Sequence, residues 1–276
     1  MQENNFINSA LKVIQIEGKA ILGLQDQIEE TFNDLCSNIL ATKGKLILMG
    51  IGKSGHIAQK ISATLSSTGT PSFFIHPTEA AHGDLGMIDK KDAILILSNS
   101  GETKEIIEIL PALKRCAGSI FTVTNNAEST IAKTGDINVL IKANEEACPL
   151  DLAPTSSSTL ALVFGDALAV SLLEHRGFTK DDFAKSHPAG QLGKKLTTLV
   201  KDIAIMGNNT PVVSKDASLK DALIEITEKK LGITLVADGK KIIGIFTDGD
   251  LRRCLNQEKD LIKTSIGTVM TKNFKS

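Results

Sequence analysis

The segment Gly50-Ile-Gly-Lys-Ser-Gly55 has the composition of a phosphate-binding loop. It follows the apolar run at 46–49 and precedes a stretch with helical spacing at 56–67. Glycines let an anion approach the backbone, and the amides and dipole of a helix N-terminus attract negative charge. Lys53 and Ser54 would add a cation and a hydroxyl to such a site. The segment predicts an anion site, and its residues leave open which phosphate it serves.

The loop partly matches two nucleotide-binding motifs, and each lacks a required partner. The dinucleotide motif G-x-G-x-x-G expects an acidic residue about 20 positions later, at the end of the second strand. The corresponding apolar strand at 71–75 ends in His76 instead. The P-loop motif G-x-x-x-x-G-K-[ST] requires glycine where this chain has Ile47. Both nucleotide interpretations therefore rank low.

A second loop of this kind follows a later apolar strand. The run Ala93-Ile-Leu-Ile-Leu97 leads into Ser98-Asn-Ser-Gly-Glu-Thr103, and a helical pattern continues at 104–114. Its hydroxyls suit one phosphate monoester at a helix N-terminus, although helix capping by Ser100 or Thr103 would explain this loop taken alone. Two such loops at strand ends favour a phosphate site. The candidate ligands here are Ser98, Asn99, Ser100 and Thr103.

Composition excludes several classes of protein. The 276 residues carry a formal net charge of -1, which gives no electrostatic case for binding nucleic acid or an anionic membrane. The four cysteines form no C-x-x-C pair, so neither a disulfide framework nor a zinc finger is expected. Without a signal-peptide pattern or an apolar run long enough to span a bilayer, we expect a soluble cytoplasmic protein. Tyr and Trp are absent, which leaves His, Glu, Asp, Lys or Cys as acid or base.

The apolar pattern predicts an α/β domain over residues 1–199. Helical patterns at 6–21 and 25–40 precede five short runs rich in Ile, Leu and Val, and a long apolar helix is expected at 160–174. The runs are continuous rather than alternating, as in strands covered on both faces, which predicts a doubly wound parallel five-stranded sheet. They lie at 46–49, 72–75, 93–97, 119–123 and 137–141. Ligands of such sheets bind at the carboxyl ends of the strands, where both loops fall.

The pattern changes after Leu199 and predicts a small α+β domain at 200–264. A short strand at 211–213, a helix at 219–229, strands at 234–237 and 242–246 and a closing segment at 247–253 give it a β-α-β-β-α order. Residues 265–276 then begin a second copy, because Ile266-Gly-Thr-Val-Met-Thr271 echoes Ile203-Ala-Ile-Met206. The repeat is incomplete.

Several motifs resemble known families. The pair of loops is similar to the sugar isomerase (SIS) domain, and Thr247-Asp-Gly-Asp-Leu-Arg-Arg253 resembles the end of a cystathionine β-synthase (CBS) motif. With further matching blocks, the chain up to Asp250 resembles the D-arabinose 5-phosphate isomerase family. These blocks are Gly50–His56, Thr68–Phe74, His76–Met87, Glu146–Pro149, Leu152–Ser156 and Ser186-His-Pro188.

The resemblance implies a reaction and an assembly. Such enzymes interconvert D-ribulose 5-phosphate and D-arabinose 5-phosphate, which feeds synthesis of 3-deoxy-D-manno-octulosonate for lipopolysaccharide. They are typically homotetramers whose active sites are shared between subunits. The resemblance also implies an inhibitory zinc ion at His76 and a nucleotide or nucleotide-sugar effector at the CBS region. Members usually carry two complete CBS motifs, whereas the second is a stub here.

The resemblance carries roles to individual residues. The family's catalytic residues match Lys53, Glu105, Glu146 and His187, and its substrate contacts match Gly69, Thr70 and His82. Moving a carbonyl between C1 and C2 requires proton transfer and a stabilised enediolate, with no cofactor. We expect Glu105 to transfer the proton, Lys53 to stabilise the oxyanion, and His187 or His82 to open the furanose ring. The helix dipole offers a simpler explanation for Glu105, which lies in a first helical turn.

Two alternatives remain at this stage. SIS domains also occur in transcription regulators, so the chain could be a non-catalytic sensor of sugar phosphates, with CBS motifs that bind adenine nucleotides. A sensor of that kind predicts a basic helix-turn-helix, but the first 44 residues contain no basic cluster. An isomerase of another phosphosugar would use the same phosphate loops. The residues also leave open whether the product serves lipopolysaccharide or capsule.

Overall fold

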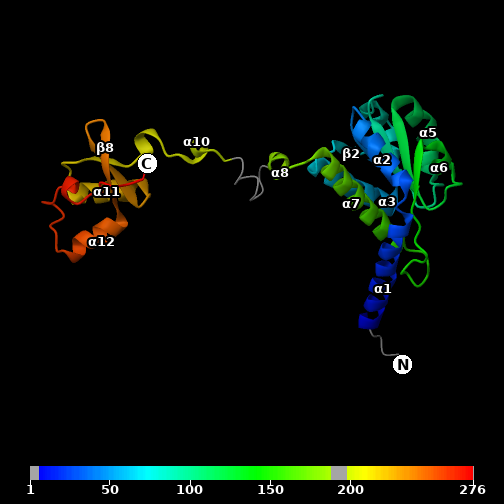
Figure 1. The fold of residues 1–276 in the computed structure, drawn as a ribbon, viewed down its shortest axis with the longest axis horizontal. Helices are drawn as coiled ribbons and strands as arrows, with labels where there is room; N and C mark the ends of the chain where they lie inside the picture. The colour runs from blue at the N-terminus through cyan, green and yellow to red at the C-terminus, as the bar shows by residue number, and fades with distance from the viewer. Residues whose placement is uncertain (1–5, 188–197, 276) are drawn as a thin grey trace. The chain divides into compact units, whose positions relative to one another are not determined.

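The computed structural model describes residues 6–187 and 198–275, and the chain divides into two compact units at 1–197 and 198–276. Each unit has a hydrophobic core of its own and is described by itself (Figure 1). Both predicted phosphate loops belong to the first unit. Pro188, the last residue of the Ser186-His-Pro188 block, lies outside the described residues.

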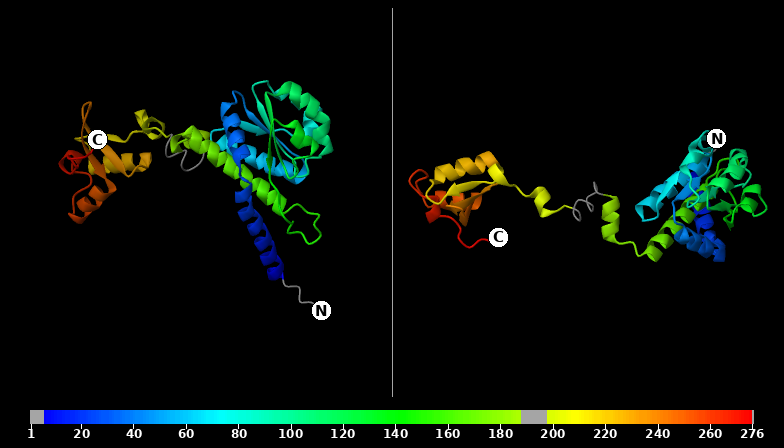
Figure 2. Two further views of the ribbon diagram at one scale, coloured as in Figure 1. Left: turned by 45° about the vertical axis from the view of Figure 1, so that its right-hand side comes forward. Right: turned by 90° about the horizontal axis from the view of Figure 1, so that it is seen from above.

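A five-stranded parallel sheet in the order β2-β1-β3-β4-β5 forms the centre of the first unit. The strands are β1 (Leu46–Met49), β2 (Ser72–Phe74), β3 (Ala93–Leu97), β4 (Ser119–Thr124) and β5 (Ile137–Leu140). Helices lie on both faces (Figure 1 and Figure 2). They are α1 (Phe6–Leu24), α2 (Glu30–Ala41), α3 (Gly52–Ser67) and α7 (Ser156–Arg176) on one face, and α4 (Pro77–Ala81), α5 (Lys104–Cys116) and α6 (Thr130–Thr134) on the other. The predicted doubly wound parallel five-stranded sheet is confirmed.

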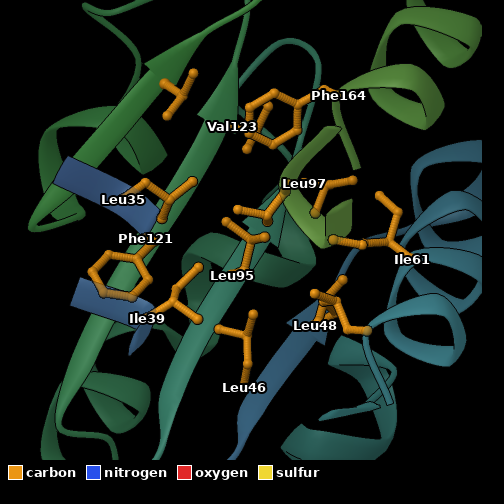
Figure 3. Close-up of a cluster of buried hydrophobic side chains, with 14 of the residues drawn as sticks. Leu35, Ile39, Leu46, Leu48, Ile61, Leu95, Leu97, Phe121, Val123 and Phe164 are labelled. Atoms are coloured by element: carbon orange, nitrogen blue, oxygen red, sulfur yellow. The ribbon is translucent and has the colours of Figure 1, made fainter. Parts of the chain in front are cut away.

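Alternate residues of β1 enter different cores. Leu46 and Leu48 face the core beneath α2, α3 and α7 (Figure 3), whereas Ile47 and Met49 belong to the core beneath α5. All four side chains are at most 1% exposed. A strand buried on both faces has no position that water can reach, which explains its continuous apolar sequence.

The helix α7 is longer than the pattern indicated, running from Ser156 to Arg176 rather than 160–174. Within the described part of the chain, it is the one helix whose length and composition would allow it to cross a membrane. Here it serves as a core helix, with Phe164 and Leu168 fully buried against the sheet side. Gly165 is also buried on α7, and its lack of a side chain lets α7 approach Ile61 of α3 closely.

The second unit has the predicted β-α-β-β-α order. Its elements are β6 (Val212–Ser214), α11 (Leu219–Lys229), β7 (Ile233–Asp238), β8 (Lys241–Thr247) and α12 (Asp248–Asn256), preceded by the short helix α10 (Val200–Ile203). β6 pairs parallel with β7, and β7 pairs antiparallel with β8. The segment at 266–271, expected to begin the repeat, packs on this unit, because Thr271 exchanges two backbone hydrogen bonds with Ile245 and Ile266 is fully buried.

We expect Gly165→Ala to destabilise the first unit by about 1–3 kcal/mol, because its new Cβ would lie 2.2 Å from the Cγ1 of fully buried Ile61. Urea unfolding of the full chain, followed by circular dichroism, measures the change. Gly18→Ala is the control, because nothing lies within 4 Å of a Cβ at that position. Replacing this helical glycine should raise the free energy of unfolding by about 0.5–1 kcal/mol. Equal effects of the two changes would contradict the packing account.

Candidate active site

The two predicted phosphate loops border one cavity at the carboxyl edge of the sheet. The glycine-rich loop joins β1 to α3, and the loop at 98–103 joins β3 to α5. Because β1 and β3 are adjacent and parallel, the two loops begin side by side. The cavity between them measures about 860 Å³. Of the predicted site residues, it is lined by Lys53, Ser54, Asn99, Ser100, Thr103 and Glu146.

The loop at 98–103 is organised by its own hydroxyls. Ser98 is 3% exposed and lies beneath the loop, with its Oγ 2.8 Å from Thr103 Oγ1. The same Oγ accepts a hydrogen bond from the Gly101 amide at 3.2 Å. The Ser98 hydroxyl therefore holds the conformation of the loop, whereas Ser100 and Thr103 line the cavity. Gly101 adopts a left-handed φ of 68°, which glycine tolerates without strain.

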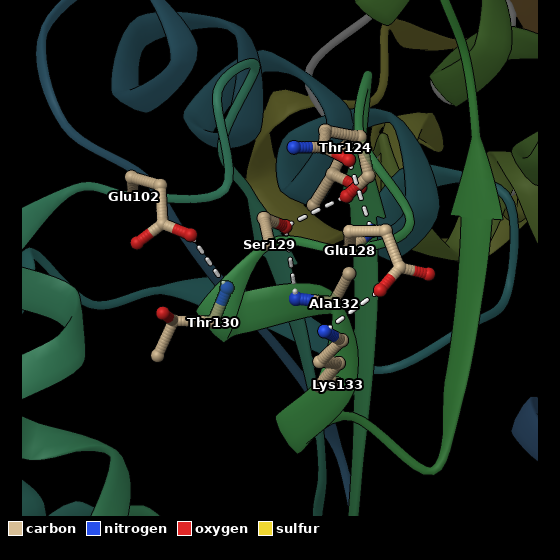
Figure 4. A network of polar contacts seen from close by, with 8 residues as sticks. Glu102, Thr124, Glu128, Ser129, Thr130, Ala132 and Lys133 are labelled. Atoms are coloured by element: carbon tan, nitrogen blue, oxygen red, sulfur yellow. Dashed lines mark hydrogen bonds and ion pairs between the residues drawn. The ribbon is translucent and has the colours of Figure 1, made fainter.

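The turn after β4 supports this loop from the side. The Glu102 carboxylate accepts a hydrogen bond from the Thr130 amide at 2.7 Å (Figure 4), and the Ile131 amide donates to the Gly101 carbonyl at 3.0 Å. Ser129 caps α6 and lies so close to Gly101 that a Cβ on that glycine would be 2.0 Å from its Oγ. These contacts hold the phosphate loop in one conformation, in which the loop and the residues that support it are hydrogen-bonded to each other.

Glu146 holds the start of α7 with a single carboxylate oxygen. Its Oε2 accepts hydrogen bonds from the Thr155 amide at 2.6 Å, the Thr155 hydroxyl at 2.9 Å and the Ser157 amide at 3.3 Å. Partial burial would raise the pKa of Glu146, but the hydrogen bonds from Ser157 and Thr155 outweigh burial and hold the pKa below its usual value. The half-buried side chain lines the cavity as a carboxylate at neutral pH.

Five residues predicted to act in catalysis or to contact the substrate lie away from the cavity of their own chain. Glu105 is exposed in the first turn of α5 and does not line the cavity. Gly69 and Thr70 precede β2, at the opposite, amino edge of the sheet, where Arg176 donates to the Thr70 hydroxyl at 3.3 Å. His82 and His187 are treated with the other histidines below. One chain therefore assembles the phosphate loops, Lys53 and Glu146, but not the whole predicted set.

The histidines occupy helix ends. His76 precedes α4 and its Nδ1 accepts from the Thr78 amide at 3.3 Å, whereas exposed His82 follows the same helix. His187 ends α8 (Lys180–Ser186), which the sequence pattern did not predict, and its ring stacks on Phe183 with centroids 4.0 Å apart. Among the residues that the structure describes, no group of three or more His, Cys, Asp or Glu side chains could hold a metal ion.

Other residues of the cavity were not predicted from the sequence. Asn125 directly follows β4, so the rule that ligands bind at strand ends could have identified it. Lys12 and Ile16 reach the cavity from α1, and no local pattern marks them. Cys148 lies in the segment at 147–155, which borders the cavity. Hydrogen bonds from backbone amides of this segment, the largest from Ala153, lower the pKa of its thiol.

We expect Gly101→Ala to abolish the thermal stabilisation of the protein by inorganic phosphate, because the loop must move off Ser129. Melting curves with and without phosphate measure this effect. Gly177→Ala is the matched control, since Gly177 has a similar left-handed φ of 63° but nothing within 4 Å of its Cβ. It should lower the melting temperature and keep the phosphate effect. A full phosphate effect in Gly101→Ala would contradict the proposed phosphate loop.

Comparison with known proteins identifies both units. The SIS domain model matches residues 39–171, and the CBS domain model matches residues 200–257. Arabinose 5-phosphate isomerase KdsD of Yersinia pestis is 51% identical over 269 residues, covering 97% of this chain and 82% of that protein. KdsD of Pseudomonas aeruginosa is 50% identical over 276 residues, covering 100% and 85%.

A solved structure supports the same assignment. An E. coli CFT073 protein in complex with arabinose 5-phosphate superposes with a TM-score of 0.66 at 43% identity, covering 68% of this chain and 100% of that one. These comparisons confirm the SIS and CBS domains and the isomerase family that the sequence motifs indicated. At this identity and coverage, the chain belongs to the arabinose 5-phosphate isomerase KdsD family.

Proposed function

We propose that this chain interconverts D-ribulose 5-phosphate and D-arabinose 5-phosphate. The observation that carries the proposal is the cavity in which Lys53 and two phosphate-type loops meet, in a chain about half identical to KdsD enzymes. The hydroxyls of Ser100 and Thr103 and the helix N-terminus behind them would hold the phosphate. The sugar carbons would then extend toward Lys53 and Ser54.

The chemistry is a proton transfer between neighbouring carbons. A base removes a proton from C1 of the ketose while the carbonyl oxygen at C2 is protonated, which gives the enediol. The C1 hydroxyl then loses its proton as C2 is reprotonated, which gives the aldehyde at C1. The Lys53 ammonium would stabilise the enediolate, and Glu105 would carry the proton. His82 or His187 would open the furanose ring. The reaction is redox-neutral within the substrate, and we propose no required cofactor.

The proposal includes a homotetramer with shared active sites. Glu105, His82 and His187 do not line the cavity of their own chain and are at least partly exposed, so a neighbouring copy would have to supply them. His187 is held by its own helix, with its Nδ1 3.1 Å from the Phe183 carbonyl oxygen, and it is half-buried. A side chain fixed in this way can present its Nε2 to another subunit.

Further features of the proposal concern regulation and location. His76 borders a second cavity of about 200 Å³ together with His56 and Gln59, and zinc bound at His76 would inhibit there. A nucleotide or nucleotide-sugar would act as an effector on the CBS unit. The enzyme would work in the cytoplasm and supply 3-deoxy-D-manno-octulosonate for lipopolysaccharide.

Incubation of the purified chain with D-ribulose 5-phosphate tests the activity. We expect NMR spectroscopy to detect D-arabinose 5-phosphate and, in D₂O, deuterium at its C2, because an enediol intermediate takes that proton from an exchangeable group. A chain that binds ribulose 5-phosphate without turnover would be a sensor. Another product sugar would indicate a different phosphosugar isomerase.

The substitution Glu105→Gln tests the assigned base. We expect kcat to fall by about 100-fold or more, because the amide cannot accept the proton. Glu108→Gln is the matched control, since Glu108 is an exposed glutamate one turn further along α5, and it should keep near-normal activity. Near-normal activity of Glu105→Gln would show that another group is the base.

A further inference from the structure

The segment at 147–155 forms one wall of the substrate cavity and is closed on itself at its two ends. The Ala147 amide donates to the Thr155 hydroxyl oxygen at 2.8 Å, although the two residues are eight positions apart. The same hydroxyl donates to Glu146 Oε2 at 2.9 Å. The wall residues that line the cavity are Ala147, Cys148, Pro149, Asp151, Leu152 and Pro154.

Burial alone does not hold this wall in place. Leu150 is 74% exposed and Leu152 is 80% exposed, so the apolar side chains of the segment add little packing. Asp151 adopts a left-handed φ of 54°, which a side chain disfavours. Ala147 is buried at one end, next to the hydrogen bonds of Thr155. The position of the wall therefore depends strongly on the polar contacts that join its ends.

Thr155 is the centre of those contacts. Its amide and hydroxyl both donate to Glu146, and its hydroxyl accepts from Ala147, so one residue makes three of the hydrogen bonds at this junction. The Ser157 amide adds a bond from the first turn of α7 to the same carboxylate oxygen. We call this arrangement of Glu146, Ala147, Thr155 and Ser157 the clasp.

We propose that Thr155 is a positioning residue for the isomerisation, and that Glu146 acts through the same clasp rather than by carrying a proton. The clasp sets the wall at 147–155 against the cavity before the substrate arrives. This inference rests on the proposed isomerase function, because it concerns the same cavity. Nothing in the loop motifs of the sequence identifies Thr155, since its partners lie eight and nine positions away in an irregular segment.

Two features of Glu146 support this role. Three hydrogen bonds converge on its Oε2, which is how a carboxylate binds a helix N-terminus, and the long helix α7 begins there. These bonds favour the charged form over the protonated form that a proton carrier must visit. A fixed wall also places the substrate with less reorganisation, which affects the rate of the chemical step more than binding by the phosphate loops.

The first test compares Thr155→Val, which has a similar shape without the hydroxyl, with Thr155→Ser, which keeps it. We expect Thr155→Val to lower kcat by about 10-fold with KM changed by less than about 3-fold, and Thr155→Ser to restore most of kcat. Thr159→Val is the control, because the Thr159 hydroxyl lies in the same first turn of α7 but bonds Glu17 of α1 instead of a residue of the wall. It should behave as wild type. Wild-type kcat in Thr155→Val would overturn the proposal.

The second test separates positioning from proton transfer, and its first arm, Glu146→Gln alone, does not depend on the folding of Thr155→Val. An amide at position 146 keeps an acceptor oxygen, so we expect Glu146→Gln to lose only about 10-fold in kcat. A proton-carrying Glu146 would lose about 100-fold or more, which would overturn the proposal. Adding Thr155→Val to Glu146→Gln should cost little further activity, because both changes open one clasp. If the fold-losses of kcat in the two single variants multiplied in the double variant, the proposal would also be overturned.

The wild-type enzyme separates the two proposals. If it fails to convert D-ribulose 5-phosphate, the proposed function fails, and the positioning role fails with it. If the wild type is active but Thr155→Val and Glu146→Gln do not follow the expected pattern, only the positioning role fails. Circular dichroism of each folded variant confirms that the kinetic changes are compared between intact proteins.

Discussion

The parallel pairing of β1 with β3 is the constraint on which the rest of the site depends. Met49 at the end of β1 lies in register with Ile96 near the end of β3, so the two polar loops start within one residue of the same level. Each loop alone would be an ordinary strand-to-helix turn. Side by side, they give a cavity with hydroxyls and amides on one wall and Lys53 on another.

This pairing is stable because both faces of the sheet are buried. Leucines of β1 and β3 enter one core, and isoleucines of the same strands enter the other. The helices that cover the faces begin at the loops, so the same packing that buries the strands also aims the helix N-termini at the cavity. Hydrogen bonds at the carboxyl edge of the sheet then fix the segments around the cavity. Glu102 accepts from Thr130 on one side, and Glu146 accepts from Thr155 on the other.

The resemblance of the chain to known isomerases assigned more residues to the active site than one chain brings together. Lys53 and Glu146 line the cavity, but Thr70 lies at the opposite edge of the sheet, and His187 ends a separate helix. The proposed site shared between copies would account for the position of His187. It would also explain how a cavity of about 860 Å³ serves a five-carbon sugar, because a neighbouring subunit would occupy part of the space.

The sequence alone determined the strands, the order of the elements, the two loops and the two units, because apolar continuity, helical spacing and glycines are local properties of the chain. It did not show how the Ser98 hydroxyl is used, since only the folded loop turns that group toward Thr103 and Gly101. Lys12 was not recognised for a similar reason, and Thr155 fell within the matching block Leu152–Ser156 without its contacts being assigned. No local pattern marks their contacts, and only the tertiary packing of α1 against α7 and of α7 against α3 decides which groups meet at the cavity.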